Sequence, residues 1–360
     1  MKHSIISPSN SSRWLSCPAS VRAIGSLDII EDISAPAAFG TLTHSLAESM
    51  LKNDKALLTN ENFYKDADAL TIEEQQLMRN YASAYTSEVQ NLQNFVNPDK
   101  FLIEHYTFLF KVGEHEIGGT CDAVMIKADH AYIIDLKTGR IPVSAVDNTQ
   151  LKLYAAGVML ENPNLKNFTL KIIQPSIKDS DSSFTISKNE LFQFYKFALT
   201  QALSCFDTNA EFKASSVACE YCQFRVKCKA HNEYIYKLLS NSDKKLEETT
   251  ISDLTRLFDN SKHIKKYLIA VEDFLLAEFQ KEDNAELLQS YDLKRSLKRE
   301  ILIENKRNKM LDILKASAYD TDKLKKVSEL KKLLLEQEQD PSEFFERPEG
   351  DLKLNRKTEV

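Results

Sequence analysis

Two aspartates and one lysine border two short apolar runs between Gly118 and Gly139. Asp122 precedes the run AVMI, and Asp135 follows the run AYII. If these runs pair as an antiparallel hairpin, both carboxylates lie at the same end of the sheet, and alternation places Lys137 on the same face as Asp135. Paired carboxylates bind hard cations such as Mg²⁺, and an ammonium group can hold a phosphate. The pattern is typical of metal-assisted phosphodiester hydrolysis, although a surface hairpin with an Asp–Lys pair has the same pattern.

Further polar residues at helical spacing could complete such a site. His44 and Glu48 are four residues apart and share one helix face, so His44 could add a nitrogen ligand while Glu48 orients the site or binds a second ion. Gln150 and Tyr154 have the same spacing, and both can hydrogen-bond a phosphate or a nucleotide. Arg140 is either a phosphate contact or a solvated arginine. An ordinary polar helix face also explains each of the two pairs.

Three cysteines with the spacing C-x2-C-x5-C form the most specific single pattern in the chain: Cys219, Cys222 and Cys228. Three thiolates need a fourth ligand, which is either Cys17, about two hundred residues upstream, or the nearer His231. A Cys3His set suits zinc, and four cysteines suit zinc or an iron–sulfur cluster. The spacing therefore predicts a metal site of one of these kinds.

Hydrophobic periodicity predicts the elements that position these residues. Apolar residues at helical spacing indicate helices over 11–25, 40–53, 71–96, 146–162 and 187–206. Between 101 and 137 the period changes to two or to continuous apolar runs, which predicts three strands, and 168–176 predicts a fourth. The order strand, strand, strand, helix, strand is typical of an α/β fold with a mixed sheet flanked by helices.

The composition is that of a globular protein of 360 residues, with 42% hydrophobic and 28% charged residues. The N-terminus has no apolar core of a signal peptide, and no run approaches the roughly 20 apolar residues that cross a bilayer. We therefore expect a cytoplasmic protein without membrane contact, in which six cysteines are not a disulfide framework. A net charge of −6 excludes a general nucleic-acid coat but leaves room for a local basic groove.

The C-terminal part differs in character, and we expect two domains, 1–235 and 236–360. The second is predicted to be mainly helical, with helices over 246–280 and 321–339 and a tail in the last twenty residues. Its segment from 294 to 309 has seven Lys or Arg against two Glu, and it could act as a DNA clamp or an oligomerisation arm. The candidate phosphate contacts in it are Lys294, Arg295, Lys298 and Arg299.

Six motifs occur in an order that resembles the RecB-like branch of the PD-(D/E)xK nuclease superfamily: SPSNSSRWLSCP, GTLTHSLAE, GGTCD, IIDLKTG, QLKLYAAG and CEYCQFRVKC. Within it, the chain is most similar to the iron–sulfur members, namely the AddB-type nuclease domain, the CRISPR adaptation exonuclease and a phage and prophage family of single-chain proteins. The resemblance covers about residues 5 to 232. It implies a restriction-endonuclease-like core sheet. The C-terminal segments YDLKRSLKREI and PEGDLKLNRKTEV resemble the phage family less specifically.

The resemblance also implies roles for the candidate residues. One or two Mg²⁺ or Mn²⁺ ions would be held by His44, Asp122, Asp135 and the carbonyl of Leu136. Lys137 would position the attacking water or stabilise the transition state, and Gln150 and Tyr154 would steady the DNA strand. A [4Fe–4S] cluster, rather than zinc, would be held by Cys17, Cys219, Cys222 and Cys228. The superfamily's proline is replaced by Cys121.

The expected function is a metal-dependent DNA exonuclease that acts on linear ends, single- or double-stranded, in phage recombination, repair or replication. Expected partners are DNA, phage recombination proteins and further copies of the chain. No phosphate-binding loop of the G-x-x-x-x-G-K-[ST] type is present, so no ATPase motor is expected. Three alternatives remain: a catalytically inactive DNA-binding accessory protein, a sequence-specific endonuclease and a zinc-stapled structural protein.

Overall fold

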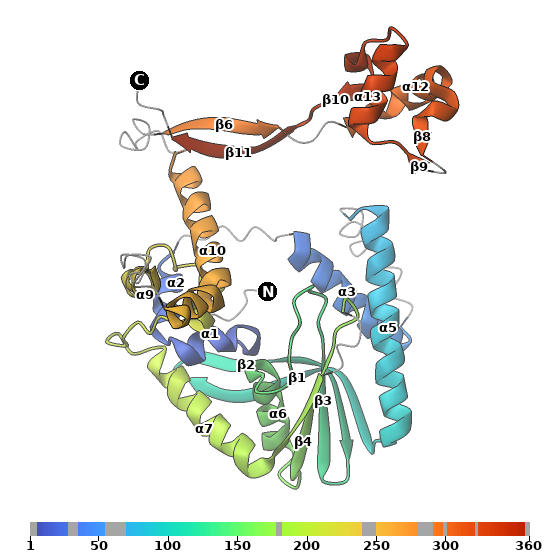
Figure 1. The fold of residues 1–360 in the computed structure, drawn as a ribbon. Coiled ribbons are helices and arrows are strands. Elements are labelled where there is room, and N and C mark those ends of the chain that lie inside the picture. The colour runs from blue at the N-terminus through green and yellow to red at the C-terminus, as the bar shows by residue number, and fades with distance from the viewer. Residues whose placement is uncertain are drawn as a thin grey trace. The chain divides into compact units, whose positions relative to one another are not determined.

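The computed structural model describes residues 6–27, 35–54, 70–177, 182–239, 250–279, 291–297, 301–320 and 323–356. The chain forms two compact units, Met1–Ile264 and Lys265–Val360 (Figure 1). The division into domains at 235/236 stays a prediction. Among the described residues, no helix is both long enough and apolar enough to span a membrane.

The first unit contains a five-stranded sheet with the order β1-β2-β3-β4-β5. Its strands are β1 (Lys100–Val112), β2 (His115–Lys127), β3 (His130–Leu136), β4 (Asn167–Ile173) and β5 (Ser182–Ser187). Only β3 and β4 pair in parallel, so the predicted mixed α/β sheet is confirmed. The edge strand β5 was not predicted, because its short Ser/Thr-rich sequence is mostly half-exposed and lacks an apolar run.

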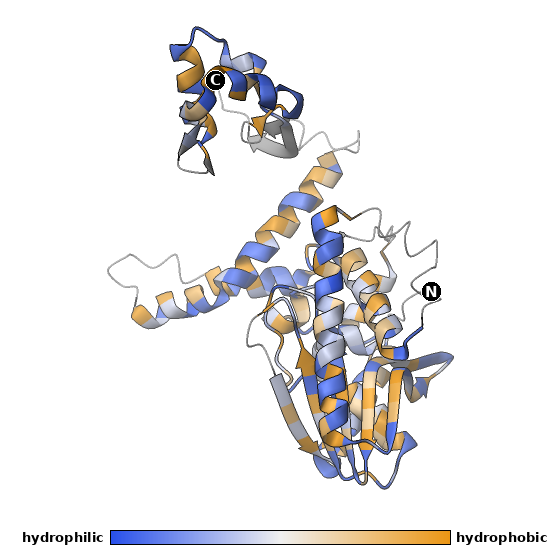
Figure 2. Cartoon of the chain, turned by 90° about the vertical axis from the view of Figure 1, so that its right-hand side faces the viewer, coloured by the Kyte–Doolittle hydropathy of each residue, from blue (hydrophilic) through white to orange (hydrophobic). Residues whose placement is uncertain are grey.

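Helices cover both faces of this sheet. The helices α3 (Ala35–Lys52) and α5 (Ile72–Val96) share one buried cluster with Met125, Ile134 and Leu136. The helices α1 (Ser11–Ser16), α6 (Thr149–Glu161) and α7 (Lys188–Ser204) share the other with Val124 and Ile133. The outward side of α5 is largely polar, whereas the strands behind it are largely hydrophobic (Figure 2). Burial on both faces explains why β2 and β3 have continuous apolar runs in the sequence.

The central helix α6 is held in place at its start and by a glycine in its middle. Asn148 is its N-cap and accepts a hydrogen bond from the backbone N–H of Leu151 at 3.1 Å. Gly157 lies against β1, where an added Cβ would come within 2.5 Å of the Cβ of Thr107. The lack of a side chain at this position therefore lets α6 approach the sheet closely.

The N-terminal segment forms two helices instead of the single helix expected over 11–25. The helix α1 ends at Ser16, and α2 (Ala19–Gly25) begins after Pro18. The break falls on Cys17, whose backbone leaves the helical region at φ −139° and ψ 81°. A residue that precedes proline is disfavoured in helical conformation, which explains the interruption. Three further helices belong to the C-terminal side of this unit: α8 (Ser216–Cys219), α9 (Lys229–Leu239) and α10 (Ile251–Phe279), which continues past Ile264.

The second unit combines a small helical cluster with a two-stranded ribbon. The cluster contains α12 (Arg307–Leu314) and α13 (Val327–Glu336), and Met310, Leu330 and Phe344 are buried in it. Short segments complete it: β7 (Ile301–Leu302), η5 (Glu304–Lys306), η6 (Lys315–Ala318), β8 (Tyr319–Asp320), β9 (Lys323–Leu324), η7 (Pro341–Glu343) and β10 (Phe345–Glu346).

The ribbon pairs β6 (Tyr291–Leu297) with β11 (Glu349–Arg356) in antiparallel fashion. The expected tail in the last twenty residues is therefore wrong. Its strand has a partner about sixty residues upstream, which local sequence patterns do not indicate.

Candidate metal and phosphate site

The two aspartates of the central hairpin lie opposite each other on neighbouring strands. Ala123 pairs with Ile134, so Asp122 lies opposite Asp135, as the sequence pattern of the hairpin predicted. Asp122 is not at the start of its strand, because β2 begins seven residues earlier, at His115. The backbone N–H of Leu136, the last residue of β3, donates a 2.6 Å hydrogen bond to Asp122 Oδ2. This bond fixes the carboxylate of Asp122 at the end of β3.

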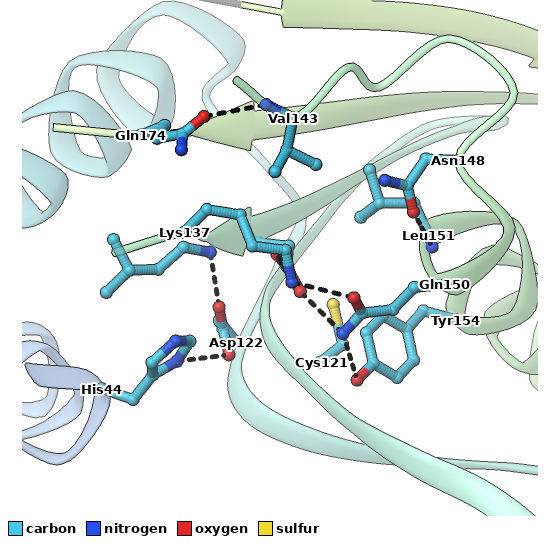
Figure 3. A network of polar contacts seen from close by, with 12 residues as sticks. His44, Cys121, Asp122, Lys137, Val143, Asn148, Gln150, Leu151, Tyr154 and Gln174 are labelled. Atoms are coloured by element: carbon cyan, nitrogen blue, oxygen red, sulfur yellow. Dashed lines mark hydrogen bonds and ion pairs between the residues drawn. The ribbon is translucent and has the colours of Figure 1, made fainter. Parts of the chain in front are cut away.

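Asp135 is buried and contacts both Lys137 and Gln150. Figure 3 shows Lys137 and Gln150 close together. Lys137 Nζ lies 2.8 Å from Asp135 Oδ2 and donates to Gln150 Oε1 at 2.8 Å. The amide group of Gln150 donates to Asp135 Oδ1 at 3.2 Å and to the Tyr154 hydroxyl at 3.2 Å. Burial opposes the charged form of Lys137, but the charges of Asp135 and Asp122 outweigh it and raise the pKa of this ammonium group. The charged form of the half-buried Lys137 is therefore favoured.

His44 reaches the same place from α3. Its Nδ1 lies 3.1 Å from Asp122 Oδ1, on the oxygen that Leu136 does not use (Figure 3). Burial lowers the pKa of His44, but the charge and hydrogen bond of Asp122 and the charge of Asp135 outweigh it, and the pKa rises to about 9. The imidazole is accordingly held against a carboxylate by electrostatics as well as by packing.

Glu104, which sequence reasoning missed, completes a group of metal donors. Donor atoms of His44, Glu104 and Asp122 all lie within 4.8 Å of one another, the spacing of a group that could hold one ion. Two carboxylates and one imidazole suit Mg²⁺ or Mn²⁺. Burial and the charges of Asp122 and Glu48 raise the pKa of Glu104 to about 7. Like-charged crowding of this kind is what a bound cation would relieve.

Glu104 was missed because of an irregularity in strand pairing. At the hairpin end, Val112 pairs with His115, a register that would place Glu104 opposite Ala123. The register shifts between Phe108 and Phe110, and the residues flanking Glu104 then bracket Asp122 on the partner strand. Glu104 itself has a φ of +51°, in the left-handed region. A bulge of this kind re-aims one side chain, and only a full tracing of the hairpin register could have indicated it.

The remaining candidates lie around this centre in different ways. Glu48 makes a 2.7 Å ion pair with Lys52 on α3, and its charge is close enough to act on Glu104. Burial, together with the charge of Asp135, raises the pKa of Tyr154 well above its usual range. Arg140 is exposed in the loop after β3 and forms no ion pair within the described ranges. Asp135 and Leu136, expected as ligands, contact Lys137, Gln150 and Asp122, and their metal roles stay predictions.

The four cysteines that resemble cluster ligands line one small cavity: Cys17, Cys219, Cys222 and Cys228. His231 is not among the lining residues. Its Nδ1 lies 3.1 Å from the carbonyl oxygen of Arg225, and its Nε2 lies 3.0 Å from Nε2 of His263 on α10. Among the described cysteines, no three sulfur atoms lie within 4.8 Å of one another. Burial raises the pKa of the Cys219 thiol to about 12, so the thiolate form needs a positive partner.

The basic candidates belong to the second unit. Lys294 and Arg295 are in the ribbon strand β6, whereas Lys298 and Arg299 lie outside the described residues. Their phosphate contacts stay predictions.

Fold and site together define an α/β protein in which α3, β1 and β2 contribute a histidine–carboxylate donor group close to the half-buried Lys137. The chain belongs to the family described as "Protein of unknown function (DUF2800)", whose model matches residues 3–359.

Two solved structures are similar to the chain at low TM-scores. SSO0001 is 15% identical, with a TM-score of 0.28, over 62% of this chain and 95% of the other. A "putative exonuclease" from Eubacterium rectale is 11% identical, with a TM-score of 0.37, over 69% and 92%.

Proposed function

We propose that this protein is a metal-dependent DNA exonuclease that hydrolyses phosphodiester bonds. The observation that carries the proposal is the close grouping of His44, Glu104 and Asp122 near the half-buried cation Lys137. The donor group fits Mg²⁺ or Mn²⁺ in ligand type and spacing. A lysine that is kept charged next to such a group suits a reaction in which negative charge builds up on a phosphate.

The divalent ion, when bound, activates water and neutralises charge on the phosphate. The residues of the chain supply orientation and a second positive charge. Leu136 holds Asp122 so that Oδ1 stays toward His44. Asp135 keeps Lys137 protonated, and Gln150 bridges the two, which fixes the ammonium group in one place. Lys137 is then positioned to bind a phosphate oxygen and to stabilise the transition state.

We also propose that the cysteine cavity holds a [4Fe–4S] cluster rather than zinc. A tetrahedral zinc ion with Zn–S distances of about 2.3 Å needs sulfur atoms roughly 3.8 Å apart. No three of the described sulfur atoms lie within 4.8 Å of one another, so they do not form a preassembled zinc site. Backbone N–H groups already point at two of them, from Lys213 to Cys17 at 3.3 Å and from Phe224 to Cys222. The guanidinium of Arg13 is buried among these thiols, where it offsets the charge of a thiolate-bound cluster.

The experiment that tests the nuclease proposal compares end-labelled linear DNA with closed circular DNA in the presence of Mn²⁺. Protein is purified without oxygen, and wild type is compared with Asp122→Asn and with the matched control Glu114→Gln, whose side chain is 97% exposed in the hairpin turn. We expect degradation of linear DNA only, and a loss of about 100-fold or more in Asp122→Asn alone.

Other outcomes lead to other functions. Cleavage of circular DNA would indicate an endonuclease. Equal inertness of wild type and Asp122→Asn, with DNA binding retained, would indicate a DNA-binding accessory protein instead. Phage recombination as the setting, and further copies of the chain as partners, are part of the proposal and need separate tests.

A further inference from the structure

A second cavity, of about 390 Å³, lies next to the candidate metal site in the chain's first unit. Its volume is in the range of about 300–1,000 Å³ that is common for small-molecule pockets. Three elements contribute to its wall, and the residues used below are Phe39 from α3, Leu77 and Tyr81 from α5, and Thr138, Gly139 and Arg140 from the loop after β3. The cavity and the metal site share the helix α3, in which Phe39 is five residues before His44, and Thr138 in the cavity wall directly follows Lys137.

The wall suits a flat aromatic ligand that carries a negative charge. The rings of Phe39 and Tyr81, which both line the cavity, lie 6.0 Å apart between centroids at an interplanar angle of 89°, as an edge-to-face pair. Arg140 is exposed at the cavity and forms no ion pair within the part of the chain that the structure describes. The one carboxylate in the wall, that of Glu74, accepts hydrogen bonds from Thr71 in the capping box of α5.

A free phosphate ion would meet a single arginine, the carboxylate of Glu74 and a mostly apolar wall, which is a poor match. A nucleobase can instead stack on aromatic side chains, with its own phosphate near a cation.

We propose that this cavity receives an unstacked nucleobase of the strand whose phosphate is cleaved, so that the substrate is single-stranded DNA or a frayed end. The inference rests on the proposed nuclease function and names its substrate class. The loop Thr138–Arg140 connects the cavity to Lys137, so a nucleotide next to the scissile phosphate is within reach of the wall. A base inside a duplex is paired and stacked on both sides and cannot enter such a cavity without being extruded.

The test is binding of a single-stranded oligonucleotide that contains 2-aminopurine, measured with Ca²⁺ in place of Mn²⁺. Full-length wild type is compared with Tyr81→Leu, Phe39→Ala and Arg140→Gln. The control is Phe95→Ala, on the same helix as Tyr81 but 86% exposed. We expect wild type to quench 2-aminopurine and to prefer the single strand over a blunt duplex. Loss of one stacking ring should weaken binding by about 5- to 100-fold, while Phe95→Ala behaves like wild type.

Two further measurements keep the outcomes distinct. Arg140→Gln alters an exposed side chain, so we expect this variant to remain folded. Circular dichroism checks the folding of all variants, and weaker binding of the single strand by folded Arg140→Gln then reports on the cavity itself. Hydrolysis of bis(p-nitrophenyl) phosphate by wild type with Mn²⁺ reports on the proposed function without any base. Unchanged binding and quenching in all three variants would overturn the cavity assignment, even if wild type hydrolyses the diester. An inert wild type whose cavity variants still lose binding would overturn the nuclease function and leave the cavity as a base-binding site.

Discussion

His44 and Glu104 both bind protons more tightly in the folded, metal-free chain than in the unfolded chain. The pKa of His44 rises from 6.5 to about 9, and that of Glu104 from 4.5 to about 7. Both groups therefore favour folding at low pH, and this contribution is lost as the pH rises through about 7 and then about 9. A bound cation reverses the trend, because it needs both side chains without their protons.

We predict that stabilisation of the protein by Mn²⁺ is greater at pH 8 than at pH 6. Below the pKa of a ligand, its proton must leave before the ion binds. The apparent affinity for the ion therefore rises about tenfold for each unit by which the pH increases toward that pKa. Thermal unfolding with and without Mn²⁺ at the two pH values measures the effect. Calorimetry in buffers of different ionisation enthalpy counts the protons released, and Glu104→Gln should release fewer. An equal shift in melting temperature at both pH values would contradict the donor group described here.

At the scale of elements, the position of α6 decides whether Gln150 and Tyr154 reach Asp135. The helix is fixed by its Asn148 cap and by the close approach of Gly157 to β1. A side chain at residue 157 would have to displace the backbone-adjacent Cβ of Thr107, which a rotamer change cannot move away. The site therefore depends on a glycine that has no chemical role.

We predict that Gly157→Ala destabilises the protein by about 1–2 kcal/mol. Alanine gains about 1 kcal/mol of helix propensity, but overpacking of this severity costs about 1–3 kcal/mol or more and exceeds that gain. Urea unfolding followed by circular dichroism measures the difference. The control is Gly139→Ala, where an added Cβ meets nothing within 4 Å. A stabilised Gly157→Ala would show that α6 can move away from the sheet freely.

The break between α1 and α2 is the second element that matters, because it turns Cys17 toward the cavity shared with the three later cysteines. We predict that Cys17→Ser, purified without oxygen, loses iron and the brown absorbance near 400 nm expected of a cluster by about half or more. The matched control is Cys205→Ser, a buried cysteine that does not line the cavity. A colourless, zinc-containing wild type would refute the cluster.

At the scale of the whole molecule, the proposed function requires an acidic protein to attract an acidic polymer. The net charge of −6 means that attraction must come from local groups, and the stretch from 294 to 309 has the densest positive charge in the sequence. The first four residues of this stretch belong to the strand β6, and β6 pairs with the C-terminal strand β11. Lys294 and Arg295 are thereby placed on a paired ribbon instead of a free tail.

We predict that the double substitution Lys294→Gln and Arg295→Gln reduces the salt dependence of DNA binding. If both side chains contact phosphates, the slope of log K against log salt concentration should become shallower by roughly 1.4 on single strands. The measurement is fluorescence anisotropy at several salt concentrations. Lys331→Gln and Lys332→Gln on α13 provide a control of equal charge change. An unchanged slope would remove the ribbon from the DNA path.

Contacts between residues close in the sequence could be predicted, whereas contacts between residues far apart in the sequence could not. Asp122, Asp135 and Lys137 belong to one hairpin, and its alternation placed them correctly. Glu104 escaped because a bulge near Phe108 shifts the register by one residue, and no local pattern specifies a bulge. The pairing of β11 with β6 escaped for a related reason, since its partner is remote in sequence. Local periodicity indicated the longer helices, but Pro18 divides one of them, α9 and α12 were not predicted, and the helix expected over 321–339 extends only over Val327–Glu336.

The cysteine cavity also sets an order of events during synthesis. Cys17 is made early, and the cavity is incomplete until Cys228 has been added, 211 residues later (228 − 17 = 211). At translation rates of about 5–20 residues per second, the first cysteine waits roughly 10 to 40 s for its partners. In that interval the central sheet, which is encoded entirely between them, is free to form. A metal group with all four cysteines can therefore bind only after the residues of the central sheet have been synthesised, and Cys17 must be kept reduced until then.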